Sequence, residues 1–283
     1  MIRTTLDKNN YSSNGIDWPI QAFEPKMVSN FHQRYLAFQD KATKIRGRET
    51  FIKPHLISIL LDQIVHHHVI LSAVEAAIGP NIVLWSSDIA IKEAGKDSYV
   101  PWHQDTPYWN LSSTDVVSVW FALTEAKVAN GAMQVIPGSH NQGALGKLNI
   151  EGDPHEAYKA GEQTSSEGNI FAYDHEMLVP VDEDDAVSVE LEPGEFSLHN
   201  IELLHGGGPN PSTEDRVGFV MHFMSTSTYC NSGKDSVTHI RGKKNHEYFV
   251  YEPRPTSDCS ENAMQALQAA LHYPSGFGDR KVQ

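Results

Sequence analysis

The order of the local hydrophobic patterns is the feature that most constrains the fold of this chain. Apolar residues recur every three or four positions over residues 24–45 and 54–77, which predicts two helices, and Gly79-Pro80 ends the second. Beyond residue 80 the pattern changes to short segments rich in β-branched and aromatic residues, separated by turns: 82–91, 116–123, 134–136, 187–191, 195–198 and 217–224. Helices followed by many short strands favour a mainly β fold, a barrel or jelly roll with flanking helices.

We expect one domain over residues 1–283, because no linker interrupts the pattern. Its parts are a helical N-terminal part (1–80), a β-barrel core (82–228) and a C-terminal extension (229–283) with a last helix at 260–271. The core carries an insertion at 141–186 that is rich in Gly, Ser and acidic residues. A loop of this length is a candidate lid over a binding site.

The charge balance excludes several classes of protein. Lysine and arginine number 22 and aspartate and glutamate 36, which gives a net charge of −14. A nucleic-acid binder or a protein that docks on anionic lipid needs a basic surface instead. No apolar run reaches the about 18 residues of a membrane span, residues 1–11 hold no signal-peptide core, and two cysteines make no disulfide framework. We therefore expect a reduced, cytoplasmic protein.

Fifteen histidines in an acidic chain direct attention to metal chemistry. His103 and Asp105 are two residues apart, so on an extended segment both side chains point the same way. His205 follows 102 residues later, just before a glycine turn. Two histidines and one carboxylate that leave open coordination positions are typical of non-haem Fe(II) oxygenases.

Arg216 lies eleven residues beyond His205, where a strand, a turn and a return strand would bring it alongside the metal. Arginine binds a carboxylate through two parallel hydrogen bonds, as a dicarboxylate cosubstrate such as 2-oxoglutarate requires. Two alternatives stay open: a non-catalytic cupin-like binding protein, and a metal-dependent hydrolase or isomerase that uses another ion.

Three segments resemble the phytanoyl-CoA dioxygenase family of Fe(II)/2-oxoglutarate oxygenases: Pro-Trp-His-Gln-Asp (101–105), Asn-Gly-Ala-Met-Gln-Val-Ile-Pro-Gly-Ser-His (130–140) and Glu-Leu-Leu-His-Gly (202–206) with the later arginine. The segments 53–55 and 79–82 are also similar, and the resemblance extends over about residues 20–228. It implies a double-stranded β-helix, Fe(II) held by His103, Asp105 and His205, 2-oxoglutarate held by Arg216, and O2 as oxidant. Gly207 departs from the family, since many relatives carry a cosubstrate-binding serine there.

The resemblance also suggests roles for residues around the metal. Asp105 favours oxygen insertion over halogenation, because halogenating relatives lack this carboxylate. We expect Trp120 and Lys53 to contact the cosubstrate. The expected substrate-binding residues are His55, Lys92, Gln104, Tyr108 and Trp109.

The predicted function is hydroxylation of a C–H bond with release of succinate and CO2. The substrate is a small polar molecule, and an anionic one such as a phosphonate or carboxylate is favoured because Lys53, His55 and Lys92 are predicted near the pocket of an acidic chain. The segment 91–105 is similar to that of bacterial relatives that hydroxylate aminoalkylphosphonates. A neutral natural-product intermediate is the alternative. The only partner expected is this small molecule, without nucleic acid or membrane, and a homo-oligomer is left open.

Overall fold

The computed structural model describes residues 2–28, 30–46, 52–106, 109–143 and 181–273. Its helices are α1 (Lys8–Asn14), α2 (Pro25–Val28), α3 (Phe31–Arg46), α4 (Ile59–Val65), α5 (His68–Ile78) and α7 (Glu261–Ala270). Short 3-10 helices are η1 (Pro54–Leu56), η3 (Val128–Asn130), η4 (Ser139–Gln142) and η5 (Glu183–Asp185). Within these ranges, no helix has the length and apolar character needed to cross a membrane.

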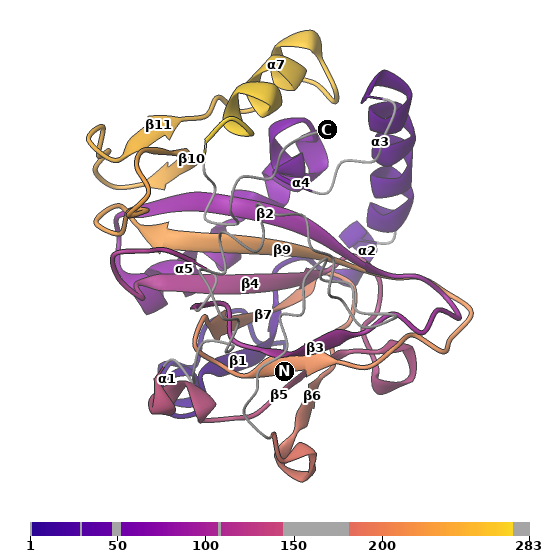
Figure 1. The fold of residues 1–283 in the computed structure, drawn as a ribbon. Coiled ribbons are helices and arrows are strands. Elements are labelled where there is room, and N and C mark those ends of the chain that lie inside the picture. Colours follow the sequence, from indigo (N-terminus) through magenta and orange to yellow (C-terminus); the bar gives the residue numbers. More distant parts are fainter. Residues whose placement is uncertain (1, 29, 47–51, 107–108, 144–180, 274–283) are drawn as a thin grey trace, which may run out of the picture.

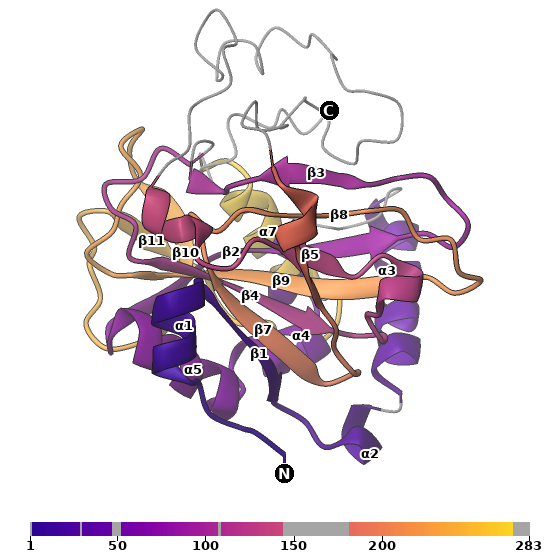
Figure 2. The same ribbon diagram turned by 90° about the horizontal axis from the view of Figure 1, so that it is seen from below.

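Two sheets face each other in the double-stranded β-helix that the sequence predicted. The larger sheet has the order β1-β7-β4-β9-β2-β10-β11 and the smaller one β3-β8-β5-β6. The strands are β1 (Ile16–Gln21), β2 (Ile82–Lys92), β3 (Val100–His103), β4 (Val116–Ala122), β5 (Met133–Val135), β6 (Val187–Val189), β7 (Glu195–Asn200), β8 (His205–Gly207), β9 (Arg216–Ser225), β10 (Asp235–Arg241) and β11 (Phe249–Tyr251). Figure 1 shows the smaller sheet below the larger one, with α3, α4 and α7 on the opposite side; Figure 2 shows the molecule from the side of the smaller sheet.

The two faces of the larger sheet have different partners, because side chains alternate along each strand. On β9, Val217, Phe219, Met221 and Phe223 pack into the hydrophobic core beneath the helices. The intervening side chains, from Arg216 to Met224, point to the other face. We call these the helix face and the inner face. Residues directly opposite each other on neighbouring strands share a face. The pairing register therefore shows which residues of the other strands lie on the helix face and which on the inner face.

The structure corrects several predicted elements. The helix expected over 54–77 is broken into η1, α4 and α5. The helix expected over 24–45 is divided into α2 and α3. The N-terminal part is not wholly helical, since β1 pairs with β7 in the larger sheet. The last helix begins as predicted, with the Ser260 hydroxyl accepting from the Ala263 amide. Most of the predicted lid, 141–186, lies outside the described residues.

Candidate metal centre

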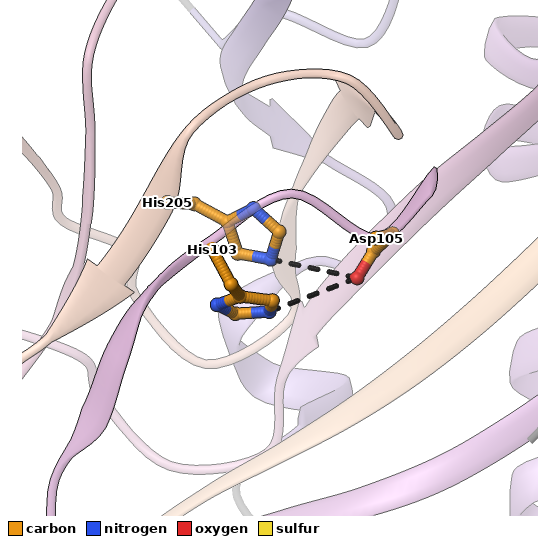
Figure 3. Close-up of side chains that lie close together, drawn as sticks. All are labelled: His103, Asp105 and His205. Carbon is orange, nitrogen blue, oxygen red and sulfur yellow. Dashed lines mark ion pairs between the residues drawn. The ribbon is translucent and has the colours of Figure 1, made fainter. Parts of the chain in front are cut away.

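His103, Asp105 and His205 come together at the edge of the smaller sheet (Figure 3). Strands β3 and β8 run antiparallel and place the two histidines directly opposite each other. Asp105 follows β3, and its Oδ1 lies 3.7 Å from His103 Nε2 and 3.9 Å from His205 Nε2. All three side chains are largely buried, with exposed fractions of 6%, 13% and 10% for His103, Asp105 and His205.

Backbone carbonyls fix the orientation of both imidazoles. His103 Nδ1 lies 2.9 Å from the Pro101 carbonyl oxygen, and His205 Nδ1 lies 2.9 Å from that of Leu203. A carbonyl only accepts, so each Nδ1 carries the proton. In the neutral ring, Nε2 then presents a lone pair toward the aspartate, which is the tautomer that a metal ligand needs.

The donor set fits one metal ion. Two atoms that each lie about 2.1 Å from an ion can be at most about 4.2 Å apart, and both carboxylate–imidazole pairs are within that limit. Two imidazoles and one carboxylate supply three donor atoms, which leaves coordination positions open for further ligands. This set suits Fe(II).

A second layer of polar side chains holds Asp105, and the sequence did not reveal it. Ser118 on β4 donates its hydroxyl to Asp105 Oδ2 at 3.1 Å, and its oxygen lies 2.9 Å from His222 Nδ1. Because the serine has a single proton, His222 must donate from Nδ1. Burial lowers the pKa of His222 to about 4, despite the nearby Asp105 charge that raises it. His222 is therefore neutral at pH 7.

Arg216 lies on the inner face at the start of β9, where its buried guanidinium packs over Trp120, 5.1 Å from the ring centroid. Trp120 shares this face and fills space that exists only because residue 218 is glycine: a Cβ there would be 2.0 Å from the indole. Arg216 Nη1 donates to the Gly131 carbonyl at 3.3 Å, and its buried Nε has no partner among the described residues. Burial lowers the pKa of Arg216 to about 10, which still leaves it charged.

Lys92 belongs to the same region as Arg216. The two residues are direct partners across β2 and β9, so both side chains point to the inner face. Lys92 is fully buried. The structure therefore places it with the candidate cosubstrate anchor.

Lys53 and His55 lie on the helix face, away from the predicted pocket. His55 contacts the Ser87 and Thr238 hydroxyls at 2.6 and 3.0 Å, and both hydroxyl residues are opposite helix-face residues, Met221 and Leu84. Lys53 Nζ donates to the Ser236 carbonyl and to Glu252, each at 2.6 Å. The structure thus differs from the expectation that these two side chains enter the pocket.

The other three residues expected to bind substrate are Gln104, Tyr108 and Trp109. Gln104 is fully buried and donates to the carbonyls of Glu202 and Gly143, so it ties loops together behind the metal-ligand segment. Trp109 is also buried and packs edge-on against His222, with ring centroids 4.7 Å apart. Tyr108 lies outside the described residues. Gln104 alternates with the metal ligands on an extended segment, which explains why it points away from them.

Two buried polar groups near the metal ligands were missed in the sequence. On β7, Ser197 and His199 are opposite Trp120 and Ser118, so both face inward. Ser197 Oγ and His199 Nδ1 have no hydrogen-bond partner in the described part of the chain. His199 packs 5.1 Å from the His205 ring, and burial holds its pKa well below the ordinary value. Buried polar atoms are usually hydrogen-bonded, so these groups are suited to receiving a polar ligand.

Comparisons with known proteins agree with this geometry. The family model described as phytanoyl-CoA dioxygenase matches residues 13–218. A probable alpha-ketoglutarate-dependent hypophosphite dioxygenase of Stutzerimonas stutzeri is 30% identical over 231 residues, covering 80% of this chain and 72% of that protein. Human peroxisomal phytanoyl-CoA dioxygenase is 29% identical over 164 residues, but these cover only 56% of this chain and 44% of the human protein.

Solved structures carry the same fold. The apo structure of the non-heme monooxygenase ThoJ superposes with a TM-score of 0.79 at 28% identity, and the match covers 94% of each chain. CytC3 with Fe(II) and alpha-ketoglutarate gives a TM-score of 0.59 at 18% identity, covering 87% of this chain and 92% of that one. With its His-Asp-His site, the chain belongs to the phytanoyl-CoA dioxygenase family of Fe(II)/2-oxoglutarate-dependent dioxygenases.

Proposed function

We propose that this protein hydroxylates a small polar substrate at an iron held by His103, Asp105 and His205. The observation that carries the proposal is the fixed tautomer of both histidines, whose Nε2 atoms converge on one carboxylate oxygen. Fe(II) bound there would supply the oxidant from O2 and 2-oxoglutarate, and 2-oxoglutarate would be converted to succinate and CO2. The chain's own contribution is to position the ligands and to exclude water from the buried inner face.

The residues around the metal ligands would have separate roles. Ser118 binds one oxygen of Asp105 and leaves the other directed at the histidines. Arg216, stacked on Trp120, would bind the carboxylate of 2-oxoglutarate that is remote from the metal. Because the indole fixes the guanidinium plane, little side-chain freedom is lost when the carboxylate binds.

For the substrate, we propose a small anion such as a phosphonate or carboxylate. Its support is the similarity to a probable hypophosphite dioxygenase, whose named substrate is a small phosphorus oxyanion. Lys53 and Lys92 do not support an anionic substrate, because Lys53 lies on the helix face and Lys92 lies beside Arg216.

A neutral polar substrate is the second candidate. Apart from Arg216 Nε, which the cosubstrate would use, the described inner-face groups without a hydrogen-bond partner are the Ser197 hydroxyl and His199 Nδ1, and both belong to uncharged side chains. Such groups recognise hydroxyls and amides as readily as anions. A neutral natural-product intermediate would fit them.

One assay tests both levels of the proposal. The full chain with Fe(II) and 2-oxoglutarate is incubated in air, and succinate is measured with and without candidate substrates, using His205→Ala as the inactive control. Small phosphonates, hypophosphite and carboxylates are compared with their uncharged esters or amides, and a coenzyme A thioester is included. Stimulation by the acids alone supports an anionic substrate, and stimulation by the neutral analogues supports the second candidate. The reaction itself is refuted if no 2-oxoglutarate is consumed under any condition.

A further inference from the structure

Among the described residues, the partners of the Lys92 ammonium are backbone oxygens alone. Nζ donates to the carbonyls of Gly131 at 2.9 Å, Gly207 at 3.0 Å and Gly208 at 2.5 Å. Arg216 Nη1 also donates to the Gly131 carbonyl. The two cations thus share one acceptor, and both are buried, with exposed fractions of 0% for Lys92 and 3% for Arg216.

In the part of the chain that the structure describes, this pair of positive charges has no counter-ion. Among the described residues, neither cation forms an ion pair or a hydrogen bond with a carboxylate. Burying adjacent like charges without compensation is costly. The consequence appears in the pKa of Lys92, which burial and then the Arg216 charge lower to about 7. An anion bound between the two side chains would remove that cost.

Gly207 explains how the lysine reaches this position. Strand β8 carries His205 and, two residues on and on the same face, Gly207. A Cβ at residue 207 would lie 2.9 Å from Lys92 Nζ and 3.0 Å from the Ala132 carbonyl oxygen. The ammonium therefore occupies the space of a side chain at 207. It thus lies beside β8, two residues beyond the metal ligand His205, and shares the Gly131 carbonyl with Arg216.

We propose that Lys92 is a second cosubstrate-binding residue, which joins Arg216 in holding the remote carboxylate of 2-oxoglutarate. This inference rests on the proposed function, because it assigns one more contact to the same cosubstrate. Each carboxylate oxygen would then receive its own charged donor. Because the ammonium has three N–H groups, it would exchange one of its three carbonyl contacts for the carboxylate and keep the other two, which aim it. The rival explanation is purely structural: Lys92 only fastens β2 to the turns at 131 and 207–208.

The two explanations differ in what they predict for ligands without the remote carboxylate. The full chain is loaded with Fe(II) under argon, and the dissociation constants of 2-oxoglutarate and 2-oxobutyrate are measured by titration of the visible absorbance of the metal chelate. Lys92→Met should weaken 2-oxoglutarate binding about 10- to 100-fold. It should leave 2-oxobutyrate, which has no second carboxylate, within about twofold. Lys96→Met, an exposed lysine in the turn after β2, is the matched control for a lost positive charge.

Equal weakening of both ligands, or no weakening of either, overturns the assignment. A second set of variants tests the same assignment in case Lys92→Met does not fold. Gly207→Ser pushes into the ammonium and should weaken 2-oxoglutarate selectively, whereas adding it to Lys92→Ala should recover affinity because the hydroxyl enters the vacated space. If the double variant is weaker than Lys92→Ala alone, the proposed overlap of the two side chains is wrong.

Failure of this inference is distinguishable from failure of the proposed function. If the wild-type chain with Fe(II) binds no 2-oxoglutarate, the function fails and the inference falls with it. If the wild type binds it and Lys92→Met binds it equally well, the inference alone is refuted.

Discussion

Replacing Lys53 by methionine should destabilise the protein and leave cosubstrate binding intact. The Lys53 and Glu252 side chains are 0% and 2% exposed and their charged atoms are 2.6 Å apart. Methionine would keep the length of the side chain but leave the Glu252 carboxylate buried without its cation. Among the described residues, the Ser236 and Thr238 hydroxyls would still donate to it, and His55 Nε2 would lie 3.7 Å away. Breaking a buried pair from one side costs about 3–5 kcal/mol, or roughly 5–10 °C in melting temperature for a domain of this size.

The assay is denaturant and thermal unfolding, together with 2-oxoglutarate titration of the folded variant. Lys26→Met removes an exposed partner of Glu24 and is the control, for which we expect no measurable change in stability. The double variant Lys53→Met/Glu252→Gln should recover most of the loss, since no unpaired charge stays buried. A Lys53→Met protein with wild-type stability but weak cosubstrate binding would refute the placement of Lys53 behind the sheet.

Acid unfolding gives an independent check on the same pair. Burial alone would raise the pKa of Glu252, but the charge of Lys53 and then the neighbouring His55 outweigh it and hold this pKa at about 2, below the ordinary value of 4.5. A carboxyl group whose pKa is lower in the folded state stabilises the fold above its unfolded pKa. This stability is fully present above pH 4.5 and is lost as the pH falls from 4.5 toward 2. The slope over that range should be shallower in Glu252→Gln.

His205→Ala should abolish stoichiometric iron binding, measured by metal analysis after gel filtration, because it removes one of three ligands; full iron occupancy would exclude this residue as a ligand. Arg216→Ala should raise the 2-oxoglutarate requirement about 30- to 150-fold and spare the iron, so an unchanged requirement would move the anchor elsewhere. Ser118→Ala frees Asp105 Oδ2 and should weaken iron binding about 10- to 100-fold in a competition titration, and wild-type affinity would show that the serine does not position the carboxylate. The affinity for 2-oxoglutarate should fall as the pH rises above about 7, where the unliganded enzyme loses the Lys92 proton; an affinity constant from pH 6 to 9 would contradict this, and Lys92→Met should remove the dependence.

The metal centre could be predicted from sequence because its geometry is local. His103 and Asp105 face one point for the simple reason that side chains alternate on an extended segment. Their partner His205 is distant in the chain, and among fifteen histidines it was identified by the family-like segment 202–206 together with Arg216. The supporting layer could not be predicted in this way. Ser118 and His222 are 104 residues apart, and only the register of β4 and β9 brings them together.

The direction of the Lys53 side chain was equally hidden in the sequence. Lys53 lies beside β2, where its amide donates to the Ser87 carbonyl, and it adopts a left-handed conformation with φ of 48°. Few non-glycine residues do so, and no alternation rule applies to such a residue. Its partner, Glu252, comes from the C-terminal extension, 199 residues later. A basic residue in a family-like segment was therefore assigned to the wrong face of the sheet.

The two faces of the sheet handle buried positive charge in opposite ways, and this contrast bears on function. On the helix face, the chain supplies its own carboxylate: Glu252 lies 2.6 Å from the Lys53 ammonium and neutralises it. On the inner face, Lys92 and Arg216 are buried as deeply, yet their described partners are carbonyl oxygens. A fold that needed these cations only for stability would gain from an acidic partner there as well. A carboxylate of the chain would instead compete with the one that 2-oxoglutarate brings. That no described carboxylate lies beside Lys92 and Arg216 is therefore what a site for a dicarboxylate requires.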